Sequence, residues 1–192
     1  MKNAIWGIAA FFLGILAIGM AGCATQENAI VGNWRSQAPE DLGTGAYGTR
    51  DFKITGSTWS VVFTMYGDKD LAHPLFSFHA QGPYSIGSPS AEAQGASEAV
   101  FSFDKKTLTL LTSNADAISS LGFGDCGLAL GEAKDISSAG CSFLPSVSAC
   151  GQEYDLVKIE GNTLYLGARP ADGNMCTEDR RPAALGFPLL NR

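Results

Sequence analysis

The sequence predicts an all-β protein: an antiparallel barrel or curled half-barrel of about seven to nine strands with one short helix. Apolar and polar residues alternate with a period of two along several segments rich in aromatic and β-branched side chains, which is the pattern of half-buried strands. The 23 glycines are spread along the 192 residues, as expected for many turns between short strands. The net charge of -6 provides no basic field, which argues against a nucleic-acid partner.

The first 22 residues are interpreted as a signal peptide. Lys2 supplies a positive charge, and residues 4–20 form an uncharged apolar run that is short for a transmembrane span. The run ends in Met20-Ala21-Gly22-Cys23, which resembles the lipobox of bacterial lipoproteins. That resemblance implies cleavage before Cys23, diacylation of Cys23 and attachment to a membrane. A plain secretory signal with an incidental cysteine is the alternative.

The residues after Cys23 indicate the membrane to which the protein is sent and how the rest of the chain is organised into domains. Residues 23–28 are interpreted as a lipidated tether, and Ala24 occupies the position where Asp would favour the inner membrane. The resemblance to lipoproteins therefore implies an outer-membrane location, on the periplasmic or the cell-surface face. No repeat or linker divides residues 29–192, so they are expected to form a single β-barrel-like domain and a monomer.

The clearest strands are residues 59–66 and 76–81, which a polar loop connects. Their predicted inner faces carry Trp59, Val61, Phe63, Met65, Phe76, Phe78 and Ala80. In chain order, strands are predicted at residues 29–37, 47–55, 59–66, 76–81, 99–103, 107–112, 154–160, 163–168 and 185–190. Gly56-Ser57 and Gly161-Asn162 each join two of them into a hairpin.

A short helix and a long loop interrupt the strands. Ser113 or Asn114 can cap a helix over residues 115–121, and Asp116 in its first turn suits the helix dipole. Residues 122–151 are rich in Gly, Ser and Cys. A loop of that length inside a compact domain is either functional or held by cross-links.

Four cysteines lie beyond Cys23, namely Cys126, Cys141, Cys150 and Cys176. An exported protein meets an oxidising environment, so the even count favours two disulfides, with three pairings open. No CxxC spacing and no nearby histidine support a metal site, and neither a metal nor another cofactor is expected.

The segments together resemble the domain of the adenomatosis polyposis coli down-regulated family, cell-surface proteins known in animals as Wnt-pathway inhibitors. The resemblance spans about residues 31–190. It rests on the order and spacing of short pieces, namely Gly32-Asn33-Trp34-Arg35-Ser36, Thr49-Arg50-Asp51-Phe52, Thr58-Trp59, Tyr66-Gly67-Asp68, His73-Pro74, Phe76-Ser77, Gly82-Pro83-Tyr84-Ser85, Asp125-Cys126-Gly127, Asp135-Ile136, Gly140-Cys141, Glu153-Tyr154, Arg169-Pro170-Ala171-Asp172-Gly173 and Pro188-Leu189.

The resemblance carries expectations about disulfides and ligands. The family's first disulfide is absent here, because its cysteines would fall at about Pro39 and Leu71. The family's later pair implies a bond between Cys126 and Cys141, which leaves Cys150 with Cys176 as an addition. The animal proteins carry two such domains and a C-terminal membrane helix, so Wnt inhibition is not carried over. The implied function is a β-barrel-like domain that holds a lipid acyl chain, such as palmitate, in an apolar interior.

An apolar-ligand carrier is the first function considered. The residues predicted to line its cavity are Phe52, Ile54, Trp59, Val61, Phe63, Phe76, Phe78, Phe101, Phe103, Leu108 and Leu110. The alternative is that these side chains simply fill the barrel, because protein interiors close-pack by default. Arg50 is predicted to point inward and to pair with Glu40. The pair either holds the loop after the first strand or anchors a ligand carboxylate, and the structural role is favoured.

Two other classes of function were considered. An enzyme is not expected, because the sequence has no G-x-S-x-G, HExxH or phosphate-binding glycine loop. His73 precedes Pro74 in a turn and His79 lies on a polar strand face, so neither is favoured as a catalytic base. A structural or adhesion lipoprotein, with a filled barrel that binds a protein or glycan on its outer surface, remains open.

Overall fold

Eight antiparallel strands close into a barrel within residues 29–192, the part of the chain that the computed structural model describes. Around the ring, β1 is followed by β3, β4, β5, β6, β9, β10 and β11, and β11 pairs with β1 to close the circle. Their bounds are Gly32–Ser36, Tyr47–Ile54, Thr58–Tyr66, Pro74–Pro89, Ser97–Ser102, Gln152–Glu160, Thr163–Gly167 and Leu185–Asn191. The predicted all-β barrel is confirmed.

Three further strands bring the sheet to eleven in the described residues. β2 (Glu40–Asp41) extends the sheet beside β3, and β7 (Lys105–Leu110) and β8 (Ala133–Asp135) extend it beside β5. Helix α2 (Ala115–Ser120) and two 3-10 turns (Gly124–Cys126 and Glu178–Arg180) complete the elements described here. Neither β2 nor β8 has enough residues to show a period, which is why the sequence did not predict them.

The long strand β5 changes partners halfway along its 16 residues. One edge pairs with β4 over residues 74–83, whereas the other pairs with β7 over residues 76–81 and then with β6 over residues 84–89. Gly82 lies at the change, where a Cβ atom would come within 2.1 Å of the backbone oxygen of Ser102. Only a residue without a side chain allows the backbones to approach this closely. The barrel wall and the β7–β8 extension therefore diverge at this glycine.

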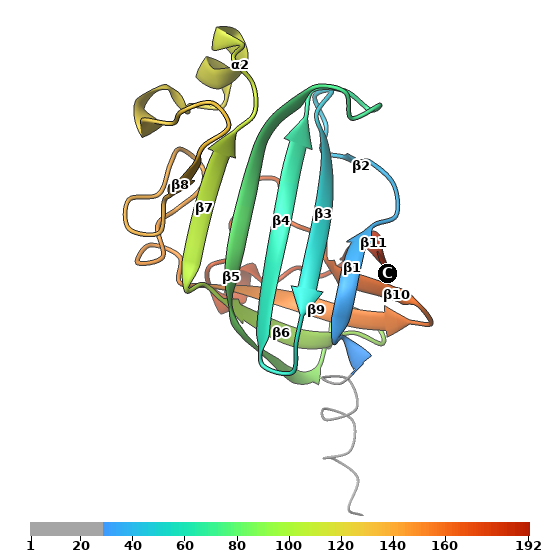
Figure 1. Cartoon of the computed structure of the whole chain (residues 1–192). Coiled ribbons are helices and arrows are strands. Elements are labelled where there is room, and N and C mark those ends of the chain that lie inside the picture. The colour runs from blue at the N-terminus through green and yellow to red at the C-terminus, as the bar shows by residue number, and fades with distance from the viewer. Residues whose placement is uncertain (1–28) are drawn as a thin grey trace, which may run out of the picture.

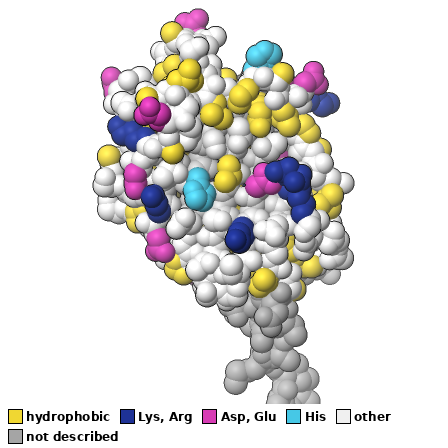
Figure 2. Space-filling view, viewed as in Figure 1, with side chains coloured by type: hydrophobic (Ala, Val, Ile, Leu, Met, Phe, Trp, Pro, Cys, Tyr) yellow, Lys and Arg dark blue, Asp and Glu magenta, His cyan; other side chains and the backbone are white. Residues whose placement is uncertain are grey.

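Two layers result from this divergence (Figure 1). Strands β3, β4, β5 and β7 stand side by side in one layer, and β6, β9 and β10 cross behind their lower ends. The upper ends of β3 and β4 extend beyond that second layer. Figure 2 shows the outer face of the first layer, on which hydrophobic side chains gather at the upper end and charged side chains are scattered across the middle.

Two large hydrophobic clusters hold the fold together. The lower one fills the barrel around Trp59, and the upper one lies between β5, β7 and the connection that follows β7. In the lower cluster, Trp34 donates from Nε1 to the carbonyl of Ile30 at 2.7 Å. Residue 29 is helical and residue 30 lies in a turn, so β1 begins at residue 32 and not at residue 29 as predicted.

The helix and both disulfides follow the sequence-based expectations. The side chain of Asn114 caps α2 by accepting a hydrogen bond from the Ala117 amide at 3.0 Å. The disulfides join Cys126 to Cys141 and Cys150 to Cys176, with Cα atoms 5.6 and 5.3 Å apart. Among residues 29–192, no helix is long and apolar enough to cross a membrane.

Candidate functional site

The interior of the lower barrel is occupied by its own side chains. The Trp59 ring lies 5.1 Å from that of Phe101 and 5.5 Å from that of Phe103, both edge-on, and its Nε1 donates to the carbonyls of Pro83 and Ser102. Six of the residues predicted to line a cavity belong to this buried cluster, namely Phe52, Ile54, Trp59, Val61, Phe101 and Phe103. These two carbonyls belong to β5 and β6, next to the residues where β5 changes its partner from β7 to β6. Trp59 therefore also connects the two layers.

The other predicted lining residues lie higher on the same inner face. Phe76, Leu108 and Leu110 are buried under the cross-linked connection after β7, against Phe123 and Ile136. Phe63 and Phe78 are only half-buried. The structure thus divides the predicted set between a filled core and an incompletely covered upper end.

A cluster of apolar residues, here called the mouth patch, occupies that upper end. It consists of Leu42, Phe63, Met65, Phe143 and Phe187. Leu42, Phe143 and Phe187 are 40, 54 and 44% exposed, and a group of exposed apolar side chains is more informative than a single one. The other two are half-buried on β4, on the face that continues upward from Trp59 and Val61.

Contacts connect Leu42, Phe63 and Phe143 of the mouth patch. The Phe63 ring lies 5.9 Å from that of Phe76, which lies 6.0 Å from that of Phe143. Gly48 makes room for Phe63, because a Cβ there would lie 2.7 Å from the Phe63 ring and 3.3 Å from Leu42. Three separate parts of the chain, around Leu42, β4 and Phe143, therefore meet at this end of the barrel.

Phe187 reaches the same end from β11. It lies two residues before the fully buried Leu189, at the irregularity in the β10–β11 register between Leu185 and Pro188. Its backbone oxygen accepts a hydrogen bond from Arg50 Nη2 at 3.2 Å. Arg50 is paired directly with Phe63 in the β3–β4 register, so this bond places the β11 backbone beside the patch.

The predicted pair of Arg50 and Glu40 forms. The Arg50 Nε lies 2.9 and 3.0 Å from the two carboxylate oxygens of Glu40. Glu40 also accepts from the Ser36 hydroxyl at 2.7 Å, and its side chain is 5% exposed. Because the carboxylate already neutralises the guanidinium, this geometry favours the structural role over a ligand-carboxylate anchor.

Two hollows lie outside the barrel interior. One, of about 610 Å³, is open to solvent and bordered by the loops around Cys126, Ile136 and Ser146. The other, of about 220 Å³, is on the outer face near Asp51 and Val62. The second is lined in part by Trp34 and Phe52, which belong to the lower cluster.

The two histidines occupy separate places on the surface of the fold. His73 is exposed and pairs with Asp68 at 2.9 Å within a turn. Backbone hydrogen bonds from Ala72 and His73, together with the His73 ring, hold the pKa of Asp68 below its ordinary value. His79 lies on the outer face, opposite Val62. Residues 29–192 contain no group of three or more potential ligands that could hold a metal ion.

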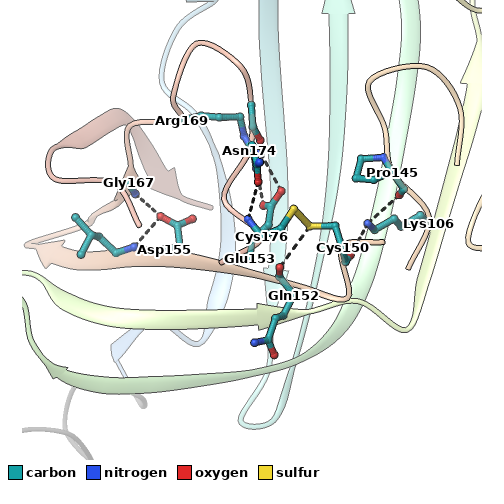
Figure 3. A network of polar contacts seen from close by, with 12 residues as sticks. Lys106, Pro145, Cys150, Gln152, Glu153, Asp155, Gly167, Arg169, Asn174 and Cys176 are labelled. Atoms are coloured by element: carbon teal, nitrogen blue, oxygen red, sulfur yellow. Dashed lines mark hydrogen bonds and ion pairs between the residues drawn. A yellow bond between two sulfur atoms is a disulfide. The ribbon is translucent and has the colours of Figure 1, made fainter. Parts of the chain in front are cut away.

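The sequence did not reveal a buried polar network near the Cys150–Cys176 disulfide (Figure 3). Lys106 Nζ donates to the carbonyls of Pro145 and Cys150, at 3.1 and 2.9 Å. Nearby, Asp155 accepts from the Leu156 and Gly167 amides, both at 2.7 Å. Lys106 shares parity with Leu108 and Leu110, so its inward direction was available in the sequence, although its carbonyl partners were not.

Together, these features define a small antiparallel β-barrel with a disulfide-cross-linked loop region. The model of the family described as adenomatosis polyposis coli down-regulated 1 matches residues 17–133, more than half of the chain. The chain belongs to this family. The match covers β1 to β7 and ends within β8, and no curated protein matches the chain. Cys23 and the predicted signal peptide lie outside the residues that the structure describes.

Proposed function

We propose that this protein is an exported lipoprotein that binds a lipid acyl chain or another apolar ligand at the upper end of its barrel. The mouth patch carries this proposal, because exposed apolar side chains from separate parts of the chain gather beside the half-buried Phe63 and Met65. Covering them with a hydrocarbon chain would contribute about 0.8 kcal/mol per buried CH₂. The family resemblance points to the same class of ligand. Because the lower interior is filled, the ligand would lie against the mouth patch rather than deep in the barrel.

The anchor is supported by the lipobox-like sequence before Cys23. Two disulfides are consistent with folding in an oxidising compartment. The first described residues, near Ile30, lie at the lower end of the barrel, where β1 begins. The mouth patch lies at the other end of β3 and β4. A lipid anchor on Cys23 would therefore leave the mouth patch accessible.

Ligand binding is tested with protein purified from membranes as the full chain. Native mass spectrometry is expected to show a co-purified acyl chain, and cis-parinaric acid, a fluorescent fatty acid, is expected to bind. Leu42→Ser should weaken that binding about tenfold, because the ligand would lose an apolar contact within the mouth patch. Val62→Ser is the matched control, because Val62 is equally exposed at 40% but lies on the outer face of β4.

The lipid anchor has its own test. Cells supplied with a radiolabelled fatty acid should incorporate label into the wild-type chain and not into Cys23→Ala. A wild-type chain that gains no label, and that sediments with the soluble fraction, would exclude the anchor without bearing on ligand binding.

A structural or adhesion lipoprotein is the second candidate, and the filled lower core favours it. In that case no acyl chain co-purifies, parinaric acid does not bind, and Leu42→Ser behaves as Val62→Ser does.

A further inference from the structure

Phe143 occupies the tip of a two-residue turn. Cys141 and Leu144 exchange both backbone hydrogen bonds, at 2.8 and 2.9 Å, so only Ser142 and Phe143 lie between the paired residues. Ser142 has a φ of 52°, in the left-handed region that residues with a side chain rarely adopt. Such backbone conformations persist where the surrounding structure enforces them, and they cluster at functional sites.

Three interactions fix the position of this turn. The disulfide to Cys126 ties its first residue to the preceding 3-10 turn. The Ser142 hydroxyl donates to the Leu121 carbonyl at 2.8 Å, at the end of α2. The Phe143 ring stacks on that of Phe123, with centroids 5.6 Å apart and planes inclined by 27°. Phe123 is itself 1% exposed, so the ring rests on the buried upper core.

The Phe143 ring nevertheless remains more than half exposed. A large apolar ring that stays exposed beside other exposed apolar side chains is typical of an interaction surface. One side of the ring is occupied by Phe123, and the ring also approaches Phe76, the neighbour of Phe63 in the mouth patch. The turn therefore holds a rigid aromatic surface in place at the edge of the patch before any ligand arrives.

A preset aromatic side chain is well suited to retaining a ligand. Binding does not have to immobilise it, so little conformational entropy is lost. We propose that Phe143 is the residue that retains the bound acyl chain, by contacting it at the edge of the mouth patch and slowing its departure. This inference rests on the proposed acyl-chain binding and adds the residue that sets the lifetime of the complex.

The test measures the rate at which cis-parinaric acid dissociates from the full-length protein when excess unlabelled oleate is added. Phe143→Ala is expected to dissociate about tenfold faster than the wild type, and Phe143→Leu is expected to lie between them. Leu130→Ala is the matched control, because Leu130 is 58% exposed in the same connection but is outside the mouth patch. Its rate should stay within about twofold of the wild type, as expected for a residue without ligand contact.

A second variant tests whether the Phe143 ring must be held in place by the disulfide, and not merely be present. The double substitution Cys126→Ser, Cys141→Ser keeps Phe143 but releases the turn, and it should also accelerate dissociation. Thermal unfolding of each variant shows whether the fold is retained. Because Phe143 is exposed, Phe143→Ala should unfold near the wild-type temperature even if the cysteine variant does not.

The outcomes distinguish this inference from the proposed function. Binding by the wild type with an unchanged rate for folded Phe143→Ala would overturn the role of Phe143 and leave acyl binding intact. Failure of the wild type to bind parinaric acid would overturn both. Equal acceleration by Leu130→Ala would also overturn the assignment, because it would show a general effect of exposed apolar residues in this connection.

Discussion

The ammonium nitrogen of Lys106 lies 2.9 Å from the backbone oxygen of Cys150, although the two residues are 44 positions apart. Lys106 is 2% exposed, and its Nζ lies 4.0 Å from the centre of the Phe103 ring. Burial lowers the pKa of Lys106, because the charged form loses its hydration. This buried cation connects β7 to the loop that carries the Cys150–Cys176 disulfide, and so connects the sheet extension to the barrel.

Lys106→Met should therefore destabilise the protein. Methionine fills much of the space of the lysine stem but leaves the carbonyls of Pro145 and Cys150 without their donor. We expect the free energy of unfolding, measured by urea denaturation, to fall by about 3 kcal/mol. Lys105→Met is the control, because Lys105 is half-exposed and 3.9 Å from Asp135, and its loss should cost less than about 0.5 kcal/mol. Equal effects of the two substitutions would contradict this role for Lys106.

Asp155 should make stability depend on pH. Burial raises the pKa of Asp155 from 3.8 to about 6. The backbone hydrogen bonds from Leu156 and Gly167 lower the pKa, but their effect is smaller. The folded state therefore holds this proton more tightly than the unfolded state. The contribution of protonated Asp155 to the free energy of unfolding is complete below pH 3.8 and is lost as the pH rises through about 6.

Asp155→Asn tests that dependence. Asparagine keeps one oxygen for the two backbone donors and cannot ionise, so the variant should be more stable than the wild type at pH 8 by up to about 3 kcal/mol. The advantage should be much smaller at pH 4.5. Urea unfolding of both proteins at the two pH values measures the difference, and an advantage that does not change with pH would refute the assignment.

Glu40→Gln tests the role of Arg50. If the pair is structural, the substitution should lower the free energy of unfolding by about 2 kcal/mol, because the largely buried guanidinium loses its counter-charge. Asp51→Asn breaks the more exposed pair with Arg35 and should cost less than about 1 kcal/mol. A ligand-anchoring Arg50 would instead be freed by Glu40→Gln, and the protein would then prefer a fatty acid over its methyl ester more strongly than the wild type does.

Gly48→Ala should disturb Phe63. The added Cβ would lie 2.7 Å from the Phe63 ring, so the ring must move. A cost of about 1–3 kcal/mol is expected for such overpacking, together with a change in the near-ultraviolet circular dichroism. Gly56→Ala is the control, because a Cβ at that position meets nothing within 4 Å. Equal stabilities of Gly48→Ala and Gly56→Ala would show that the Phe63 ring can move to another position without loss of stability.

Much of the fold was predictable because it depends on local patterns. Period-two alternation identified the barrel strands and assigned the inward direction to Phe63, Phe76 and Leu108, as observed. The parity of Arg50 predicted its inward direction, and the resemblance to the family suggested Glu40 as its partner, which the structure confirms. The mouth patch was found only in part, because Leu42 and Phe143 lie outside the periodic segments.

The sequence by itself determined which residues form strands and which side of each strand faces inward, because alternation along a strand is a local property. Only the tertiary structure decided what covers that inner face. The change of partners at Gly82, the filling of the lower barrel around Trp59 and the exposure at the mouth patch all depend on contacts between distant segments. Alternation fixes the direction of a side chain but not its neighbours, which is why the same apolar pattern gave a filled core at one end and an exposed surface at the other.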